Sequence, residues 1–435
     1  MKIMLPIIGE LNFFDLSVPG THDSLTYDLS EIFADRANDI PLNYSFFFHT
    51  YLSQYFGGYA KKQAVTQTLN IKQQLDNGVR WLDLRAVLSR DSPYSFTQSW
   101  YGLHFMQTND KLLDLAWEIR DWMNNHDQEI VILQLTYHGE QCYSENDYPG
   151  ITTAQKREFW NDFIEIFQDI AYNSENYSPL NEMSINNLID ADIRTVIYVS
   201  DYEQFTDNSP YAINGCQVEQ FGNSDIYNQQ ESYEYEINFF ENYHTIKSQK
   251  KQNNIYTVKS MATSGMAETM IYSFLDNFLP ESFSNLILWQ KYNCVLNFQI
   301  PANQFCPEIL LDLGQWTNYY KQLTLDIALQ NNYSLPNAVF VDQIDHEGTM
   351  RTGINTGAIN YNQQQNEQNA RYSFSAAIIK ANWNQYCLSN ALTAQQQFNC
   401  QIIQNYFQIS FDKYPVYTFN NVQYGRLIDW PQQLN

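Results

Sequence analysis

The sequence predicts an α/β protein in which helices and strands alternate around a (β/α) barrel. Short runs of β-branched and apolar residues, such as 195–199 and 338–341, have the length and composition of strands that are buried on both faces. Each run follows a stretch in which apolar residues recur at helical spacing. Repeated pairs of a helix and a buried strand indicate a parallel sheet, and 435 residues are enough for one elaborated barrel.

The helices and strands follow from the same two patterns along the chain. Capping residues and Asn pairs mark where the clearest helix begins and ends. The expected elements are, in chain order, a strand at 14–18, a helix around 69–75, a strand at 79–87, a helix from the capping residues 108–110 to Asn124, a strand at 130–133, a helix at 159–170, a strand at 195–199, a helix at 309–329 and a strand at 338–341.

The domain organisation is predicted from changes in composition. We expect one barrel domain over residues 1–350 and a C-terminal extension over 351–435 that packs on the barrel. Residues 202–260 are rich in Tyr, Asn, Gln and Glu and have no long apolar periodicity. This stretch is therefore predicted to be a polar insertion in the barrel domain.

The charge of the chain excludes one class of partner. The sequence holds 48 acidic and 24 basic residues, which gives a formal net charge of −24. A surface field of this sign repels nucleic acid, so we expect no nucleic-acid partner. No apolar stretch approaches the roughly 18–20 residues of a membrane span, and no secretory leader is evident. We therefore expect a soluble protein without a transmembrane segment.

The cysteines bear on metal binding and on the compartment. Six cysteines lie far apart and form no Cys-x-x-Cys pair, which argues against a zinc site, and no cofactor is expected. Three Asn-Tyr-Ser sequons suit a secreted protein, whereas unpaired buried thiols suit a cytosolic one. The compartment stays open, with the cytoplasm preferred.

Charged side chains and histidines stand at the ends of predicted strands. His22 and Asp23 follow the first strand, and Asp83 and Arg85 alternate with leucine, so both point to the same face of their strand. His104 lies one strand later. Because barrel enzymes keep their sites at the carboxyl ends of the strands, we expect these five side chains to meet at one rim.

This set of groups suits phosphodiester cleavage. One imidazole removes a proton from the attacking hydroxyl, the other protonates the leaving oxygen, and a fixed cation stabilises the charge at phosphorus. The same residues also fit structural roles. Asp83 and Arg85 would form a buried salt bridge, and His104, in an apolar segment, would be a core histidine.

Four segments resemble the X-domain of the phosphatidylinositol-specific phospholipase C family in order and spacing. They are Pro-Gly-Thr-His-Asp-Ser at 19–24, Leu-Asp-Asn-Gly-Val-Arg-Trp-Leu-Asp-Leu-Arg at 75–85, Gly-Leu-His at 102–104 and Glu-Ile-Val-Ile-Leu-Gln-Leu at 129–135. The resemblance is clearest to the metal-independent bacterial branch and to single-X-domain eukaryotic proteins. It implies a distorted, incompletely closed TIM-type (β/α)8 barrel.

The resemblance also implies that His22 is the general base. An acidic residue on a late strand should orient it, and Asp342, at the end of the predicted strand 338–341, is preferred over Asp345. By the same resemblance, the base removes the proton of an inositol 2-hydroxyl, which then attacks phosphorus.

The other roles are likewise implied by the resemblance. Arg85 would stabilise the transition state, because it stands where calcium-dependent relatives hold the metal. His104, held by Asp23, would be the general acid, and Asp83 would contact sugar hydroxyls or fix the guanidinium. One departure is Phe105, since relatives place Gly after this histidine.

The predicted activity is cleavage of an inositol phospholipid or glycolipid to diacylglycerol and a cyclic inositol phosphate, without a metal. The acidic chain favours a zwitterionic surface, a detached head group or a glycolipid over an anion-rich leaflet. Aromatic clusters at 46–48 and 274–279 suit either peripheral membrane contact or the core.

Two alternatives remain. One is a metal-dependent phosphodiesterase on the same barrel that acts on glycerophosphodiesters or sphingolipids, although such sites need several converging carboxylates where this chain has Arg85. The other is a non-catalytic scaffold or binding protein that kept the fold.

Overall fold

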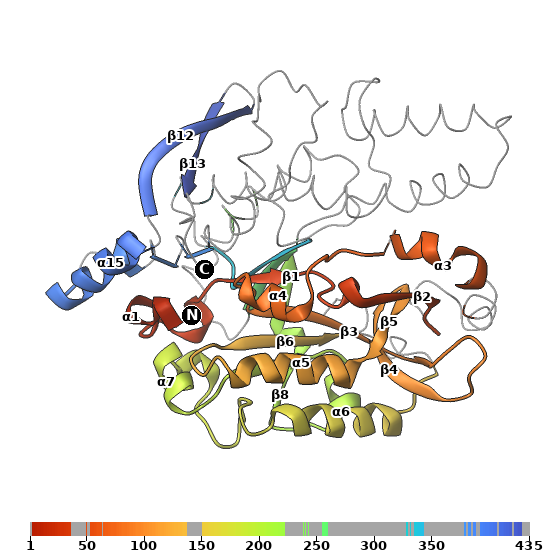
Figure 1. The fold of residues 1–435 in the computed structure, drawn as a ribbon. Helices are drawn as coiled ribbons and strands as arrows, with labels where there is room; N and C mark the ends of the chain where they lie inside the picture. The colour runs from red at the N-terminus through yellow and green to blue at the C-terminus, as the bar shows by residue number, and fades with distance from the viewer. Residues whose placement is uncertain are drawn as a thin grey trace, which may run out of the picture.

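The computed structural model describes most of the N-terminal half of the chain and selected parts of the rest (Figure 1). The described residues are 2–35, 49, 53–62, 64–136, 150–221, 238, 240, 242, 255–259, 328, 331, 335–342, 378–379, 382–383, 386–388, 392–406, 409–419 and 422–428.

The described residues form an eleven-stranded mixed sheet. The strands that run parallel are neighbours in the order β8, β7, β6, β3, β1, β11, β10, β9. Beyond its parallel part, β3 continues into an antiparallel ladder with β4, β5 and β2. The strands are β1 Val18–Thr21, β2 Leu29–Phe33, β3 Trp81–Arg90, β4 Gln98–His104, β5 Met106–Lys111, β6 Val131–Thr136, β7 Thr195–Val199, β8 Ala212–Asn214, β9 Val218–Phe221, β10 Ile255–Lys259 and β11 Ala338–Val341.

The α/β class is confirmed, but the predicted distorted (β/α)8 barrel is not confirmed. Within the described residues the sheet has two ends, because β8 and β9 form no ladder with each other. The first and last parallel strands in the sequence, β1 and β11, do pair directly, with Val18 beside Ala338 and Thr21 beside Val341. This pairing brings together segments that are far apart in the sequence.

Helices lie between the strands along the chain, largely as the sequence predicts. Described residues form α1 Leu5–Ile8, α3 Ser53–Lys62, α4 Ile71–Asp76, α5 Leu112–Asn124, α6 Thr153–Phe167, α7 Ile185–Asp190, α8 Tyr202–Thr206 and α15 Ala394–Tyr406. The α4 and α6 helices begin with capping boxes at Asn70 and Thr152. The helix expected at 309–329 lies outside the described residues except for Ala328.

Two predicted boundaries are corrected. The segment 108–110 was expected to cap a helix, but it pairs as part of β5, and the helix begins at Leu112 after Lys111. The first strand was expected at 14–18 but occupies Val18–Thr21. Asn12 accepts a hydrogen bond from the Phe14 amide and starts a short 3-10 helix there instead.

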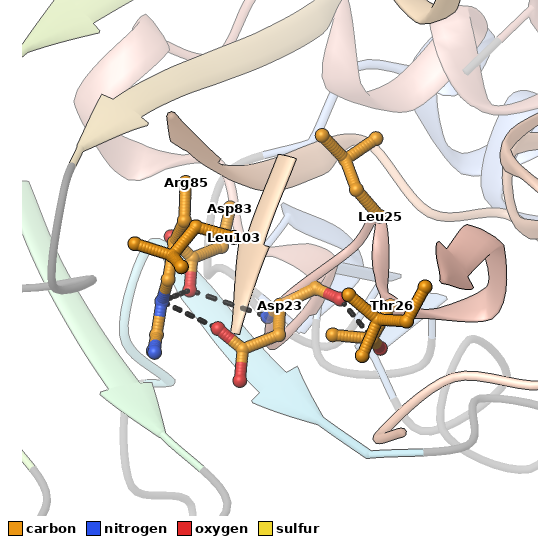
Figure 2. A pocket seen from close by; sticks show the side chains of 7 residues that line it. Asp23, Leu25, Thr26, Asp83, Arg85 and Leu103 are labelled. Carbon is orange, nitrogen blue, oxygen red and sulfur yellow. Dashed lines mark hydrogen bonds and ion pairs between the residues drawn. The ribbon is translucent and has the colours of Figure 1, made fainter. Parts of the chain in front are cut away.

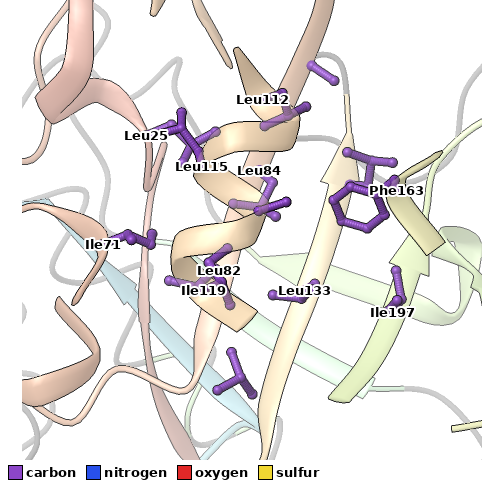
Figure 3. Close-up of a cluster of buried hydrophobic side chains, with 14 of the residues drawn as sticks. Leu25, Ile71, Leu82, Leu84, Leu112, Leu115, Ile119, Leu133, Phe163 and Ile197 are labelled. Carbon is purple, nitrogen blue, oxygen red and sulfur yellow. The ribbon is translucent and has the colours of Figure 1, made fainter. Parts of the chain in front are cut away.

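The alternation of side chains along the strands creates two different faces. Leu82 and Leu84 of β3 pack with α5 and with apolar residues of β6 and β7, as Figure 3 shows. The opposite face carries Trp81, which stacks on Tyr198 at 5.6 Å between ring centroids and meets Phe340 edge-on at 5.8 Å. Asp83 and Arg85 follow Trp81 on this second face, so the aromatic cluster lies beneath the charged groups.

The predicted polar insertion at 202–260 is narrower than expected. Its first part forms α8, β8 and β9, and its end forms β10, so these ranges belong to the central sheet. These strands are short and bear polar residues, so they lack the long apolar runs that indicate a buried strand in the sequence. Residues 222–254 lie almost wholly outside the described part of the chain.

The described part of the C-terminal segment 351–435 contacts the N-terminal residues. Asn399 of α15 donates a hydrogen bond to the Pro6 carbonyl at 3.1 Å, and a disulfide joins Cys387 to Cys400. Trp383 is buried in the apolar cluster that includes residues of α1. A separate antiparallel hairpin is formed by β12 Ile409–Phe419 and β13 Val422–Ile428.

None of the helices in the described residues has both the length and the apolar character needed to cross a bilayer. The predicted solubility and the predicted compartment both stay predictions.

Candidate active site

The predicted site residues meet where β1 and β11 end and where the parallel pairing of β3 ends. His22 and Asp23 directly follow β1, Asp83 and Arg85 lie on β3, and Asp342 directly follows β11. Because β1 pairs with both β3 and β11, the register brings these positions to the same edge of the sheet. His104 arrives from the end of β4, whose antiparallel ladder with β3 returns the chain to this edge.

His22 is held by contacts on both ring nitrogens. Its Nδ1 lies 2.9 Å from Oδ1 of Asp342, and its Nε2 lies 2.9 Å from Nη2 of Arg85. A carboxylate can only accept, so Nδ1 carries the proton and Nε2 is left as the proton acceptor. The imidazole is 17% exposed, whereas the Asp342 side chain is 1% exposed. The structure thus pairs His22 with the acid that the sequence analysis preferred; the rival Asp345 lies outside the described residues.

Arg85 is held against two fully buried carboxylates (Figure 2). Its Nε contacts Oδ1 of Asp23 and lies 3.6 Å from Oδ2 of Asp83. The Asp23 amide also donates to Asp83 Oδ2 at 3.3 Å. Asp23 adopts a φ of 48°, in the left-handed region that asparagine and aspartate tolerate better than most residues. The Asp23 carboxylate thus lies against Arg85 of β3.

The second histidine faces the same carboxylate. His104 Nδ1 lies 2.6 Å from the Ala64 carbonyl, which fixes the proton on Nδ1, and Nε2 lies 3.6 Å from Oδ2 of Asp23. Nε2 of His22 lies 3.4 Å from that same oxygen, and the two rings are 6.5 Å apart between centroids. Both imidazoles therefore direct Nε2 towards one shared region.

Burial changes the acidity of His104. Removal from water disfavours the imidazolium and lowers the pKa of His104 below its ordinary 6.5. The negative charge of Asp23 raises this pKa in part, and the positive charge of Arg85 lowers it further. The residue after His104, Phe105, has a φ of 56°. This is the backbone region that favours glycine, so Phe105 adopts a conformation that is uncommon for a bulky residue.

Sequence reasoning did not identify the neutral groups around the histidines. Gln67 is fully buried, and its Nε2 donates to the carbonyls of both His22 and Val341 at 2.9 Å. Thr66 Oγ1 donates to the His22 carbonyl at 3.1 Å. The segment that carries them has no motif, and only the fold brings it beside β1. Asp201, just after β7, pairs with the buried Lys156 of α6. This lysine also has no sequence signature.

Oxygen and nitrogen ligands for a metal ion are present, but a cation already lies among them. Ligand atoms of His22, Asp23 and Asp83 lie within 4.8 Å of one another. The Arg85 guanidinium contacts Asp23 and is close to Asp83, so its positive charge stands where a divalent ion would bind these carboxylates. These residues fit a divalent ion poorly, because the guanidinium and the ion would repel each other.

The family model described as PI-PLC X 1 matches residues 48–232 of this chain. Asp83, Arg85 and His104 lie inside the matched range, whereas His22 and Asp342 lie outside it. PI-PLC X domain-containing protein 1 of Mus musculus is 34% identical over 146 residues, which is 33% of this chain and 40% of the mouse protein. The protein of the same name from Danio rerio is 26% identical over 40% of this chain and 59% of its own length. The match thus spans less than two thirds of either relative.

Among solved structures, the phosphatidylinositol-specific phospholipase C from Listeria monocytogenes is 15% identical, with a TM-score of 0.45, over 78% of this chain and 93% of that enzyme. The corresponding enzyme of S. aureus is 14% identical, with a TM-score of 0.43, over 78% and 90%. The family model and the named relatives carry the same X-domain description. Three of the four segments from the sequence analysis, 75–85, 102–104 and 129–135, lie inside the matched range, and 19–24 lies outside it. Over residues 48–232 the chain therefore matches the PI-PLC X domain family.

Proposed function

We propose that this protein is a phosphodiesterase that cleaves an inositol phospholipid or glycolipid to diacylglycerol and a cyclic inositol phosphate. The observation that carries the proposal is the position of the two imidazoles. The Nε2 atoms of His22 and His104 lie 3.4 and 3.6 Å from the same Asp23 oxygen, beside the guanidinium of Arg85. A proton acceptor, a proton donor and a cation are thus available on one small region.

His22 acts as the general base. With its Nδ1 proton bound to Asp342, its Nε2 takes the proton of the inositol 2-hydroxyl, and that oxygen attacks phosphorus. Asp342 stabilises the imidazolium that forms, because it is a buried carboxylate at 2.9 Å. Arg85, which contacts Nε2 in the structure, turns its guanidinium to the phosphate oxygens when substrate enters.

His104 acts as the general acid. Its Nδ1 is bound to the Ala64 carbonyl, so the proton on Nε2 of the imidazolium is the one that passes to the departing diacylglycerol oxygen. The bond from phosphorus to that oxygen breaks as the bond to the inositol 2-oxygen forms. A lowered pKa makes the His104 imidazolium a stronger proton donor, and Asp23 counteracts part of the shift.

The strand arrangement supports this assignment. The order of the parallel strands, with β11 beside β1, is that of a (β/α)8 barrel opened between β8 and β9. The reacting groups would then lie at the carboxyl rim, where such barrels carry their sites.

The metal-dependent phosphodiesterase stays a second candidate, because His22, Asp23 and Asp83 offer three ligand atoms within 4.8 Å. Arg85 argues against it, since an ion in that position would have to displace the guanidinium from Asp23. Activity in the presence of a chelator separates the two candidates.

The test is the release of cyclic inositol phosphate from phosphatidylinositol micelles with chelator present. We compare the wild type with His22→Ala and His104→Ala, and use His126→Ala as the matched control because His126 stacks on Trp122, on the α5 helix. Turnover by the wild type and His126→Ala alone is expected. Turnover that requires calcium would favour the metal-dependent candidate. Binding of inositol phosphate without turnover of phosphatidylinositol or glycosylated inositol lipids would favour a scaffold.

A further inference from the structure

The turn between β3 and β4 exposes two aromatic side chains to solvent. Phe96 is 101% exposed and Tyr94 is 72% exposed, which are the largest exposed fractions among the described large apolar side chains. Single exposed apolar residues are ordinary on protein surfaces. Here two of them lie two residues apart on one turn, which we call the hairpin tip and define as residues 92–97.

The hairpin tip is ordered by its own hydrogen bonds. The Asp91 amide donates to the Thr97 carbonyl at 3.1 Å, and Thr97 Oγ1 donates to the Asp91 carboxylate at 2.7 Å. Ser95 and Thr97 are joined through their hydroxyls at 2.7 Å. Because these hydrogen bonds already hold the turn, a partner can bury the aromatic rings without further ordering of the backbone.

The charge of the hairpin tip differs from that of the rest of the chain. Residues 92–97 have no charged side chain, although the whole protein carries a net charge of −24. The two charged groups at its base are engaged, since Arg90 pairs with Asp35 at 2.7 Å and Asp91 binds Thr97. An uncharged aromatic tip on an acidic protein suits a surface that is neither strongly cationic nor strongly anionic.

The hairpin tip extends from the strand that carries the candidate active site. Arg85 lies on β3, and the strand continues in the same direction to Arg90 before the turn. At about 3.3 Å per residue, this places the start of the turn roughly 17 Å beyond Arg85. Figure 1 shows the β3–β4 hairpin extending past the neighbouring strands at the edge of the molecule.

We propose that the hairpin tip docks the protein on a zwitterionic lipid surface, with Phe96 and Tyr94 entering the interface between head groups and acyl chains. Phe96 supplies apolar area, and Tyr94 combines an aromatic ring with a hydroxyl that stays with the head groups. The proposal rests on the proposed function only in that a lipid substrate is reached at a surface. Docking itself needs no turnover.

The test is co-sedimentation of the full chain with phosphatidylcholine vesicles, which contain no inositol lipid. Tyr94→Ser and Phe96→Ser should each weaken partitioning about tenfold, because burial of one aromatic side chain is worth about that factor or more. Trp117→Ser is the matched control, since Trp117 is an exposed aromatic at 52% on α5 and should leave partitioning unchanged. Adding phosphatidylserine should weaken binding of the wild type, because the acidic chain is repelled.

Three results would overturn the proposal: no binding of the wild type to phosphatidylcholine vesicles, equal loss in Trp117→Ser, or tighter binding as phosphatidylserine is added. If the hairpin tip instead contacts another protein, the first of these results is obtained. Hydrolysis of water-soluble cyclic inositol phosphate gives an independent readout. Tyr94→Ser and Phe96→Ser should keep the wild-type rate there, so loss of docking is distinguished from failure of the proposed activity.

Discussion

The paired strands β1 and β11 have titratable side chains at their carboxyl ends and neutral amide side chains at their amino ends. At the carboxyl ends, His22 and the buried Asp342 form a hydrogen bond at 2.9 Å. At the amino ends, neutral amides connect the chain: Asn382 accepts from the Ser17 amide at 3.1 Å and donates to its carbonyl at 2.7 Å. Asn337 donates to the Leu16 carbonyl at 3.2 Å.

This difference separates chemistry from stability. Buried charges are costly unless they are paired, so a cluster of them at one end indicates a site that needs ionised groups. Neutral hydrogen bonds above an apolar cluster, in which Trp383 is buried, maintain the fold without titrating. We therefore expect substitutions at the carboxyl ends to alter activity and those at the amino ends to alter the free energy of unfolding.

The largest expected effect is that of His22→Ala on turnover. Loss of the proton acceptor should lower kcat/KM at least about a hundredfold, the lower bound for a general base. The free energy of unfolding should fall by about 1–3 kcal/mol, because the buried Asp342 carboxylate loses its hydrogen-bond partner although no cavity opens in the apolar core. Cyclic inositol phosphate release and urea unfolding measure the two quantities. A variant that keeps turnover would remove His22 from the mechanism.

Trp383→Ala tests the opposite end. Truncation of a buried tryptophan in the cluster beneath β1 should lower the free energy of unfolding by about 3–5 kcal/mol. The kcat of the folded fraction should stay at the wild-type value. Phe398→Ala is the control on the same C-terminal segment, since Phe398 is 60% exposed and its loss should cost about 0.5 kcal/mol or less. Equal losses in both variants would mean that the segment does not support the sheet.

Gln67→Ala tests whether a neutral residue at the carboxyl ends affects both properties. It removes the amide that donates to the carbonyl of His22 and to the carbonyl of Val341, the residue before Asp342. We expect about 1–3 kcal/mol of destabilisation and roughly a tenfold lower kcat. Gln74→Ala is the matched control, because this buried glutamine binds the Ser24 and Leu69 carbonyls instead. If both variants lower kcat equally, Gln67 has no specific positioning role.

The smallest effect concerns pH. The imidazolium of His104 is the active form of a general acid, so kcat/KM falls as pH rises through its pKa, which burial holds below 6.5. Asp23 raises this pKa, so Asp23→Asn should move the alkaline limb of the profile to still lower pH. The pH dependence of kcat/KM measures this shift. An unchanged limb would assign it to another group.

The same pKa has a consequence for stability with the opposite pH sign. Because folding lowers the pKa of His104, the folded protein favours the neutral ring. This contribution is present above the unfolded value near 6.5 and is lost as pH falls through the folded pKa. Urea unfolding in acid, wild type against His104→Ala, should show a smaller loss on acidification in the variant.

Much of the site could be predicted because its residues stand in local patterns. The alternation of Asp83 and Arg85 with leucine fixed their common face, and the run 338–341 placed Asp342 at the end of a strand. The strands at 195–199 and 338–341 agree with the predicted ranges to the residue. Local periodicity is sufficient in such cases because each strand is buried on both faces.

Other features had no local signal. The strands β8 to β10 are short and partly polar, and their place in the sheet depends on their neighbours. Phe13–Asp15 has an apolar beginning that suggests a strand, yet the Asn12 cap forms a 3-10 helix. Competition between propensity and capping is decided by the contacts of the folded chain.

The sequence by itself identified the candidate groups for the proposed chemistry: two histidines, one arginine and the acids beside them, in a fixed order along the chain. The pairing of His22 with Asp342 was expected from the resemblance, but the tertiary structure decided the other contacts and all of the geometry. The contact of His22 with Asp342 spans 320 residues, and that of His104 with the Ala64 carbonyl depends on a segment without a motif. Side-chain pairing across such distances follows from strand register and burial, which are properties of the whole fold and leave no trace in the spacing along the chain.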